Sequence, residues 1–273
     1  MTGAIRDTMP RSMPQRRSPT LATRLPAMLG AGLRAGQTIL VVVDDHSPVP
    51  PPIDARRDAW LPRLTADLAV LTASDEISLA IISRRSMTDL RNGIGLDRAI
   101  YAASHGLDIA GPSIHFRHPA ADKRRPLIEA LGQTLRARVA HVPGVSVRLD
   151  GVGVAVDFED PGADDVRSVL TPRDGRLSVV RGRNTIDVVP TGWWGRSPCV
   201  ALIRDALGRR HRSMITTIYL GDDDAEIRFR ALGESILTVK IGGRPLTWAA
   251  CRLPDVETAQ STLAALAYTI GSR

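Results

Sequence analysis

The sequence predicts an α/β fold in which a parallel sheet is interrupted by an inserted α+β module. Strand and helix patterns alternate over 36–117 and again over 191–273, whereas antiparallel hairpin patterns fill 118–190. The apolar run at 39–43 has no polar alternation, which is typical of a strand buried on both faces of a parallel sheet. We therefore expect a doubly wound core formed by the two outer segments, with the module inserted between them.

Hydrophobic periodicity places the elements of the core. We expect strands at 39–43, 77–82, 99–103, 213–220, 235–241 and 247–252. Leucines at three- to four-residue spacing predict a helix over 56–74, and the other core helices are expected at 86–93, 199–207, 227–232 and 256–270.

The inserted module has its own pattern. An amphipathic stretch predicts a helix over 125–139, and a second helix is expected at 160–170, where a proline near its start is tolerated. Two hairpins are expected, one at 145–149 with 152–158 and one at 177–181 with 184–189. Together they predict an antiparallel sheet with helices beside it.

Composition places the chain among ordinary globular proteins. Of 273 residues, 43% are hydrophobic and 24% are charged, and no window approaches 18 uninterrupted apolar residues, so we expect no membrane span. The two cysteines, Cys199 and Cys251, are too few for a disulfide scaffold or a four-cysteine zinc site. Since no secretory signal is visible, we expect reduced thiols and a cytoplasmic location.

The net charge of +7 is concentrated at the N-terminus. Residues 1–35 hold six arginines and a single acid, Asp7, which account for +5 and leave +2 for the other 238 residues. We expect 1–35 to be a basic, flexible tail, and because the rest of the chain has no basic stripe, we expect no nucleic-acid partner.

Polar clusters follow four of the expected strands, and ligands of parallel sheets bind at the carboxyl ends of strands. Two carboxylate groups at one edge suit Mg²⁺, and a nearby hydroxyl and arginines suit a phosphoryl group. A carboxylate can also serve as the nucleophile, so the combination indicates metal-assisted phosphoryl transfer. The clusters are Asp44-Asp45-His46, Ser83-Arg84-Arg85, Ser104-His105-Gly106 and Gly221-Asp222-Asp223.

Four segments resemble the trehalose-6-phosphate phosphatase family of the haloacid dehalogenase superfamily. They are IISRRSMTDLR (81–91), IYAASHGLDI (100–109), GVGVAVDF (151–158) and IYLGDD (218–223). The resemblance, over about 37–270, implies a Rossmann-like core with a cap inserted between the second and third motifs. It also implies Mg²⁺ as cofactor, a small sugar phosphate as substrate and trehalose-phosphate synthase as a candidate partner.

The family's first motif, DxDGT, fits the sequence in two frames. In one, Asp44 is the nucleophile and a metal ligand, and His46 replaces the aspartate that acts as general acid and base. In the other, Asp45 is the acid and Val43 occupies the nucleophile position. We favour the first frame, because Val49 and the prolines after it then match the family's next residues.

The remaining motifs supply the other expected site residues. The resemblance implies that Ser83 and Arg84 bind phosphate, although the family usually has glycine at the second position, and that Arg85 contacts substrate. It implies metal ligation by Asp222 and Asp223.

The lysine of the family's third motif has no counterpart, because no lysine lies between Lys123 and Lys240. The nearest cation is Arg196, which we expect to bind phosphate despite its planar, forked group. The family's sugar-contacting loop matches His105, Gly106 and Asp108, which are therefore expected to bind substrate.

Three hypotheses follow. The first is a Mg²⁺-dependent phosphatase that hydrolyses trehalose 6-phosphate through an aspartyl-phosphate. The second is a catalytically impaired relative with a binding or regulatory role, favoured by the altered first motif, the missing lysine and the changed cap. The third is a phosphatase for another sugar phosphate, because acids such as Asp157 and Glu159 replace cap cations of the family.

Overall fold

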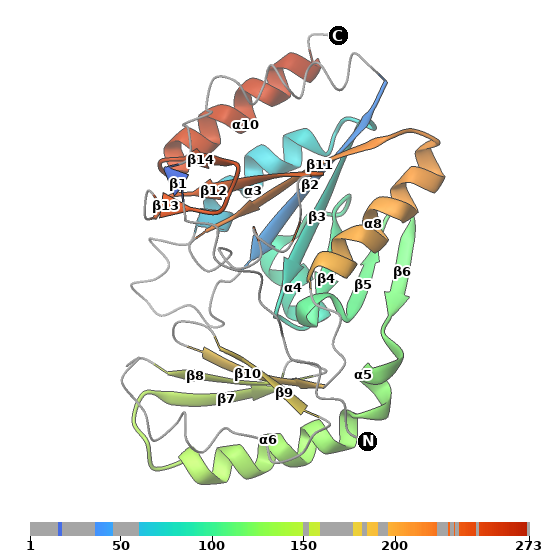
Figure 1. The fold of residues 1–273 in the computed structure, drawn as a ribbon. Helices are drawn as coiled ribbons and strands as arrows, with labels where there is room; N and C mark the ends of the chain where they lie inside the picture. Colours follow the sequence, from blue (N-terminus) through green and yellow to red (C-terminus); the bar gives the residue numbers. More distant parts are fainter. Residues whose placement is uncertain are drawn as a thin grey trace.

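A computed structural model places two sheets in separate layers (Figure 1). It describes residues 16–17, 36–45, 60–149, 153–158, 177–181, 185–190, 196–222, 229, 232, 235–243 and 246–271. The larger sheet has eight strands in the order β14-β12-β11-β2-β3-β4-β5-β6, and the smaller has four in the order β7-β8-β10-β9.

The centre of the larger sheet is parallel, as the uninterrupted apolar run predicted. All eight residues of β2 are buried, and its apolar residues 39–43 alternate between two core clusters on opposite faces of the sheet. The parallel strands are β2 (Thr38–Asp45), β3 (Ile77–Ser83), β4 (Ile100–Ala103), β11 (Ile215–Gly221), β12 (Ile236–Ile241) and β14 (Cys251–Leu253).

Helices cover both faces of this sheet, which confirms the predicted doubly wound core. On one face lie α3 (Trp60–Leu71), α4 (Met87–Ile94) and α10 (Val256–Gly271), which pack on Val41 and Val43. On the other lies α8 (Arg196–His211), which packs on Leu40 and Val42. The expected helix 227–232 lies mostly outside the described residues. None of the described helices has both the length and the apolar character that crossing a bilayer requires.

Two strands were not predicted. The antiparallel strands β5 (Asp108–Gly111) and β6 (Ile114–Arg117) extend the sheet beyond β4. Each has four residues, which is too short for a two-residue hydrophobic period to stand out from a loop.

The smaller sheet confirms the predicted hairpins. Its strands are β7 (Val145–Leu149), β8 (Val154–Phe158), β9 (Leu177–Arg181) and β10 (Thr185–Pro190). One face packs on α6 (Arg125–Val139), which follows the short α5 (Pro119–Lys123). Alternation along β8 and β10 puts Asp157, Thr185 and Asp187 on the opposite face. The expected helix at 160–170 lies outside the described residues.

Residues 1–35 are described at Arg16 and Arg17 alone, and there the structure differs from the expected flexible tail. These two residues form β1, which pairs antiparallel with β13 (Leu246–Thr247). Backbone pairing of this kind depends on a partner strand distant in the sequence, and charge composition carries no signal of it.

A tight turn follows β4. The 3-10 segment η1 (Ser104–Gly106) has three successive positive φ angles, 49°, 61° and 88°. Gly106 is required on two grounds: its left-handed backbone, and the lack of space for a Cβ, which would stand 2.8 Å from the Sγ of Cys199 and 2.9 Å from its Cβ. Burial raises the pKa of that thiol to about 12, so Cys199 packs as an inert apolar group.

Gly106→Ala is expected to lower the free energy of unfolding by about 2–4 kcal/mol, through backbone strain and overpacking combined. The matched control is Gly95→Ala, since Gly95 has a φ of 68° but open space where its Cβ would lie. Strain alone predicts a loss of about 1–2 kcal/mol there. Urea denaturation of both variants measures the difference, and equal losses would contradict the packing role.

Candidate active site

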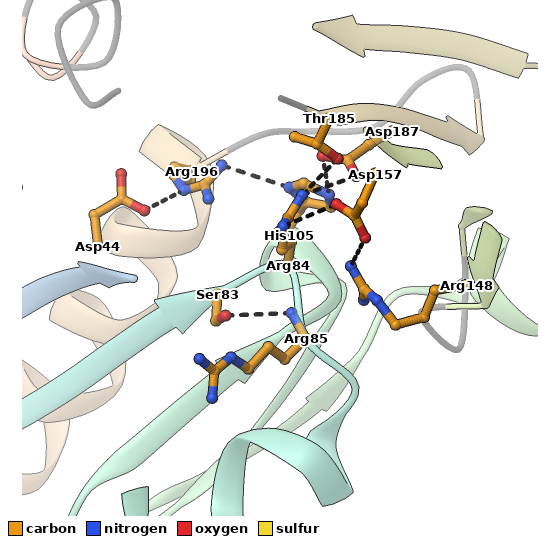
Figure 2. Close-up of polar contacts among 10 residues, drawn as sticks. All are labelled: Asp44, Ser83, Arg84, Arg85, His105, Arg148, Asp157, Thr185, Asp187 and Arg196. Carbon is orange, nitrogen blue, oxygen red and sulfur yellow. Dashed lines mark hydrogen bonds and ion pairs between the residues drawn. The ribbon is translucent and has the colours of Figure 1, made fainter. Parts of the chain in front are cut away.

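The predicted strand ends meet at one edge of the larger sheet. In the parallel register Asp45 pairs with Ser83 between β2 and β3, and Val43 pairs with Leu220 between β2 and β11. The polar residues after β2, β3 and β11 therefore lie at the same level. The four-stranded sheet lies beyond this edge (Figure 1), and side chains from both sheets meet there (Figure 2).

Asp44 is fully buried, and both of its oxygens accept hydrogen bonds. Arg196 donates from Nε to Asp44 Oδ1 at 2.7 Å, and the Tyr219 hydroxyl donates to Oδ2. The first residue of α8 thus supplies the cation of this site. Burial opposes the charge of Arg196, but the combined effect of Asp44, Tyr219 and Asp187 outweighs it, and the pKa of the guanidinium is raised.

The next carboxylate, that of Asp45, has different partners because successive side chains of a strand alternate in direction. Ser83 donates from Oγ to Asp45 Oδ2 at 3.0 Å, and Arg85 Nε lies 3.3 Å from the same oxygen. The Ser83 hydroxyl also accepts from the backbone N–H of Arg85 at 3.2 Å. The serine expected to bind phosphate is therefore held by the second aspartate in this closed arrangement.

His105 lies between the two sheets. Its Nδ1 accepts from Arg196 Nη1 at 3.5 Å, and its Nε2 lies 3.4 Å from Asp187 Oδ2 on β10. Burial lowers the pKa of the imidazole, and this effect exceeds the opposing attraction of Asp187. Burial raises the pKa of Asp187, but the contact with His105 and the charges of Arg84 and Arg148 outweigh it and leave it lowered. A neutral imidazole thus faces an ionised carboxylate.

Arg84 extends from the core into the polar face of the smaller sheet. Its Nη2 lies 3.1 Å from Asp157 Oδ1, and its Nη1 donates to Thr185 Oγ1 at 2.6 Å and lies 3.8 Å from Asp187 Oδ1. Arg148 Nη2 donates to the other Asp157 oxygen at 3.0 Å. The Arg84 guanidinium, which follows Ser83 in the chain, is thus paired with acids of the smaller sheet.

Other predicted site residues lie apart or beyond the described part of the chain. The carboxylate of Asp108 faces Arg117 at 3.7 Å rather than the buried contacts, and Gly106 packs on α8. Asp222 follows β11 and is half-buried. His46 and Asp223 are outside the described residues, within which no three His, Cys, Asp or Glu side chains gather as a metal site.

Four residues that make these contacts were not predicted: Arg148, Thr185, Asp187 and Tyr219. The sequence pattern that could have indicated these residues is weak. Tyr219 is a polar aromatic side chain within an apolar strand, two residues before Gly221, and Asp187 alternates with Ile186 and Val188. Such a pattern shows which face of a strand is polar, but not what that face contacts.

The contacts are balanced in charge. Four guanidinium groups meet four carboxylates, while His105 is neutral. A phosphate monoester dianion would bring two further negative charges without a surplus guanidinium among these groups to match them. The donor chemistry fits Mg²⁺, since Asp44, near the end of β2, and Asp222, just after β11, offer hard carboxylate oxygens on neighbouring strands.

Known proteins share this fold and sequence pattern. A family model for trehalose-phosphatase matches residues 51–232. A trehalose-phosphate phosphatase of Mycobacterium marinum is 30% identical over 192 residues, which make up 67% of this chain and 49% of that protein. This chain therefore spans about half the length of the curated relatives it matches.

Solved structures show the same fold. A trehalose-6-phosphate phosphatase related protein has a TM-score of 0.67 at 19% identity, covering 86% of this chain and all of that one. The C-terminal domain of Candida albicans trehalose-6-phosphate phosphatase has a TM-score of 0.64 at 17% identity, covering 93% of this chain and 99% of that one. The predicted α/β fold, in which an α+β module interrupts a doubly wound core, is thereby confirmed, and the chain belongs to the trehalose-phosphatase family.

Proposed function

We propose that the protein is a Mg²⁺-dependent phosphatase that hydrolyses trehalose 6-phosphate. The observation that carries the proposal is the Asp44 carboxylate, which lies one residue before the end of the central strand β2 and accepts from the Arg196 guanidinium. The same position supports the frame with Asp44 as nucleophile, because Val43, the alternative, is an apolar side chain within the core cluster beside α3. As part of this proposal, the protein acts in the cytoplasm on the product of a trehalose-phosphate synthase.

The proposed reaction has two displacements at phosphorus. A carboxylate oxygen of Asp44 attacks the phosphoryl group, the P–O bond to the sugar breaks, and His46 gives a proton to the departing sugar oxygen. Water then attacks the phosphorus of the aspartyl-phosphate and gives a proton to His46, and the P–O bond to Asp44 breaks, which releases the carboxylate and inorganic phosphate. In this proposal the Arg196 guanidinium orients the carboxylate, and Ser83 and Arg85 bind phosphoryl oxygens once substrate displaces their contacts with Asp45. Bound Mg²⁺, held by Asp44, Asp222 and Asp223, would supply positive charge to the phosphoryl oxygens.

Substrate access requires the four-stranded sheet to move. Asp44 is fully buried, and the contacts of Arg84 and His105 with the cap close the approach from this side. We infer that the ion pairs of Arg84 break as the cap opens and re-form, or are replaced by substrate oxygens, as it closes.

The wild-type protein is expected to release phosphate from trehalose 6-phosphate in the presence of Mg²⁺, and EDTA is expected to abolish the release until Mg²⁺ is restored. A colorimetric phosphate assay measures both. Glucose 6-phosphate and other sugar phosphates form the comparison panel. Faster turnover of another member of the panel would reassign the substrate, and background release from every member would contradict the phosphatase proposal.

The second candidate function is sugar-phosphate binding without turnover. It is favoured by the closed state of the site, in which Arg196 and Tyr219 hold both oxygens of Asp44, and Asp45 holds Ser83. Isothermal titration of the wild-type protein with trehalose 6-phosphate distinguishes this candidate, since saturable heat without phosphate release would support it.

A further inference from the structure

A chain of three contacts connects the cap to the proposed nucleophile. From Asp187 on β10 it passes through His105 to Arg196 and ends on Asp44, with separations of 3.4, 3.5 and 2.7 Å (Figure 2). These four residues are between 0% and 5% exposed. Asp187, which belongs to the cap, is therefore connected to the proposed nucleophile through two core residues, His105 and Arg196.

The two ring nitrogens of His105 have opposite partners, and this defines the tautomer. Nδ1 faces the Arg196 guanidinium, which can only donate, so Nδ1 accepts. Nε2 faces the ionised carboxylate of Asp187, which can only accept, so Nε2 carries the proton. A proton on Nδ1 would instead point at the donor that aligns Asp44.

The backbone of His105 is held in a costly conformation. Ser104 and His105 have φ angles of 49° and 61°, in the left-handed region that residues with a Cβ rarely adopt. Such strain persists only where the surroundings hold it in place. Here the imidazole has a partner at each end: Arg196 of α8 at 3.5 Å from Nδ1, and the carboxylate of Asp187 on β10 at 3.4 Å from Nε2, a charge contact without hydrogen-bond geometry.

We propose that Asp187 is a positioning residue for phosphoryl transfer: from the cap, it fixes the Nε2-protonated tautomer of His105 and so keeps Arg196 aligned on Asp44. This inference rests on the proposed phosphatase function. Its consequence is that docking of the cap and alignment of the nucleophile are coupled. The core by itself has no carboxylate next to His105 Nε2, and Asp187 takes that place only when β10 docks on the core.

The substitution that tests the proposal is Asp187→Asn, which keeps the shape of the side chain. Asp187 Oδ1 faces Arg84, a fixed donor at 3.8 Å, so the single carbonyl oxygen of the new amide is expected to turn toward Arg84. Its NH₂ group then faces Nε2 of His105 and drives the ring proton to Nδ1, against Arg196. We expect kcat to fall about 10- to 100-fold, the range seen for orienting groups behind catalytic residues, with little change in KM.

Asp157→Asn is the matched control. Asp157 lies on the same face of the cap sheet, but it pairs with Arg84 and Arg148, whereas Asp187 lies against His105. A general loss of cap docking would affect the two variants alike and would raise KM. The positioning role predicts a large loss of kcat for Asp187→Asn and at most a small one for Asp157→Asn.

A second measurement does not depend on turnover. Imidazole ¹⁵N chemical shifts of the full chain, with the His105 signals assigned by their loss in His105→Gln, report which nitrogen is protonated. We expect Nε2 in the wild type and in Asp157→Asn, and Nδ1 in Asp187→Asn. A wild-type ring protonated at Nδ1, an unchanged tautomer in Asp187→Asn, or equal kcat losses in the two variants would each overturn the proposal. Absence of phosphate release by the wild type would instead refute the proposed function, while the ¹⁵N shifts would still test the contact chain.

Discussion

Asp44→Asn is expected to reduce phosphate release by at least about 1000-fold, because the variant lacks the carboxylate that attacks phosphorus and an amide oxygen is a far weaker nucleophile. The substituted side chain can still accept the hydrogen bond from Arg196, so its size and position are retained. Loss of the negative charge leaves a buried guanidinium less well compensated, and some loss of stability accompanies the loss of activity. Phosphate release is therefore measured well below the thermal midpoint of each variant.

Asp45→Asn is the control that separates the two frames of the first motif. Asp45 is as deeply buried as Asp44, but its partners are Ser83 and Arg85. If Asp44 is the nucleophile, Asp45→Asn retains measurable turnover and Asp44→Asn does not. The opposite ranking would refute the assignment of the nucleophile to Asp44.

Arg196→Met is expected to lower the free energy of unfolding by about 3–5 kcal/mol, because it removes one partner of a buried ion pair and leaves the other charge without compensation. The Arg196 and Asp44 side chains are 2% and 0% exposed, so water cannot replace the missing cation. The control is Arg63→Met, which breaks an ion pair with Glu257 between side chains that are 39% and 66% exposed. A surface pair of this kind contributes about 1 kcal/mol or less.

Arg196→Lys distinguishes the contribution of the positive charge to stability from that of the forked shape of the guanidinium. Lysine restores the cation that the family has in its third motif, but a single ammonium is a poor match for the two directions in which Arg196 now donates, to Asp44 and to His105. We expect this variant to recover most of the stability lost in Arg196→Met. Urea denaturation measures all three variants, and equal losses for Arg196→Met and Arg63→Met would show that the buried pair is not important for stability.

Local patterns were sufficient for most of the fold. The unbroken apolar run of β2 predicted a strand buried on both faces, and the helix of residues 125–139 was predicted with the bounds that it has in the structure. The strands β5 and β6 were missed because four residues give too little periodicity to distinguish a strand from a loop. The helix expected at 160–170 and the role of His46 stay predictions.

The candidate site also has one part that the sequence predicts and one part that only the tertiary structure determines. By itself the sequence determined which residue types follow each strand, and the parallel topology then brought Asp44, Ser83 and Gly221 to one edge, because the carboxyl ends of parallel strands share an edge. Only the tertiary structure decided which groups pair: Arg196 with Asp44, Ser83 with Asp45, and Arg84 and His105 with acids of the cap. These partners lie between 38 and 152 residues apart in the sequence, and the side-chain directions that join them depend on how two sheets dock. Docking buries the charged groups together, and a buried charge needs a compensating partner that no local pattern of residues specifies.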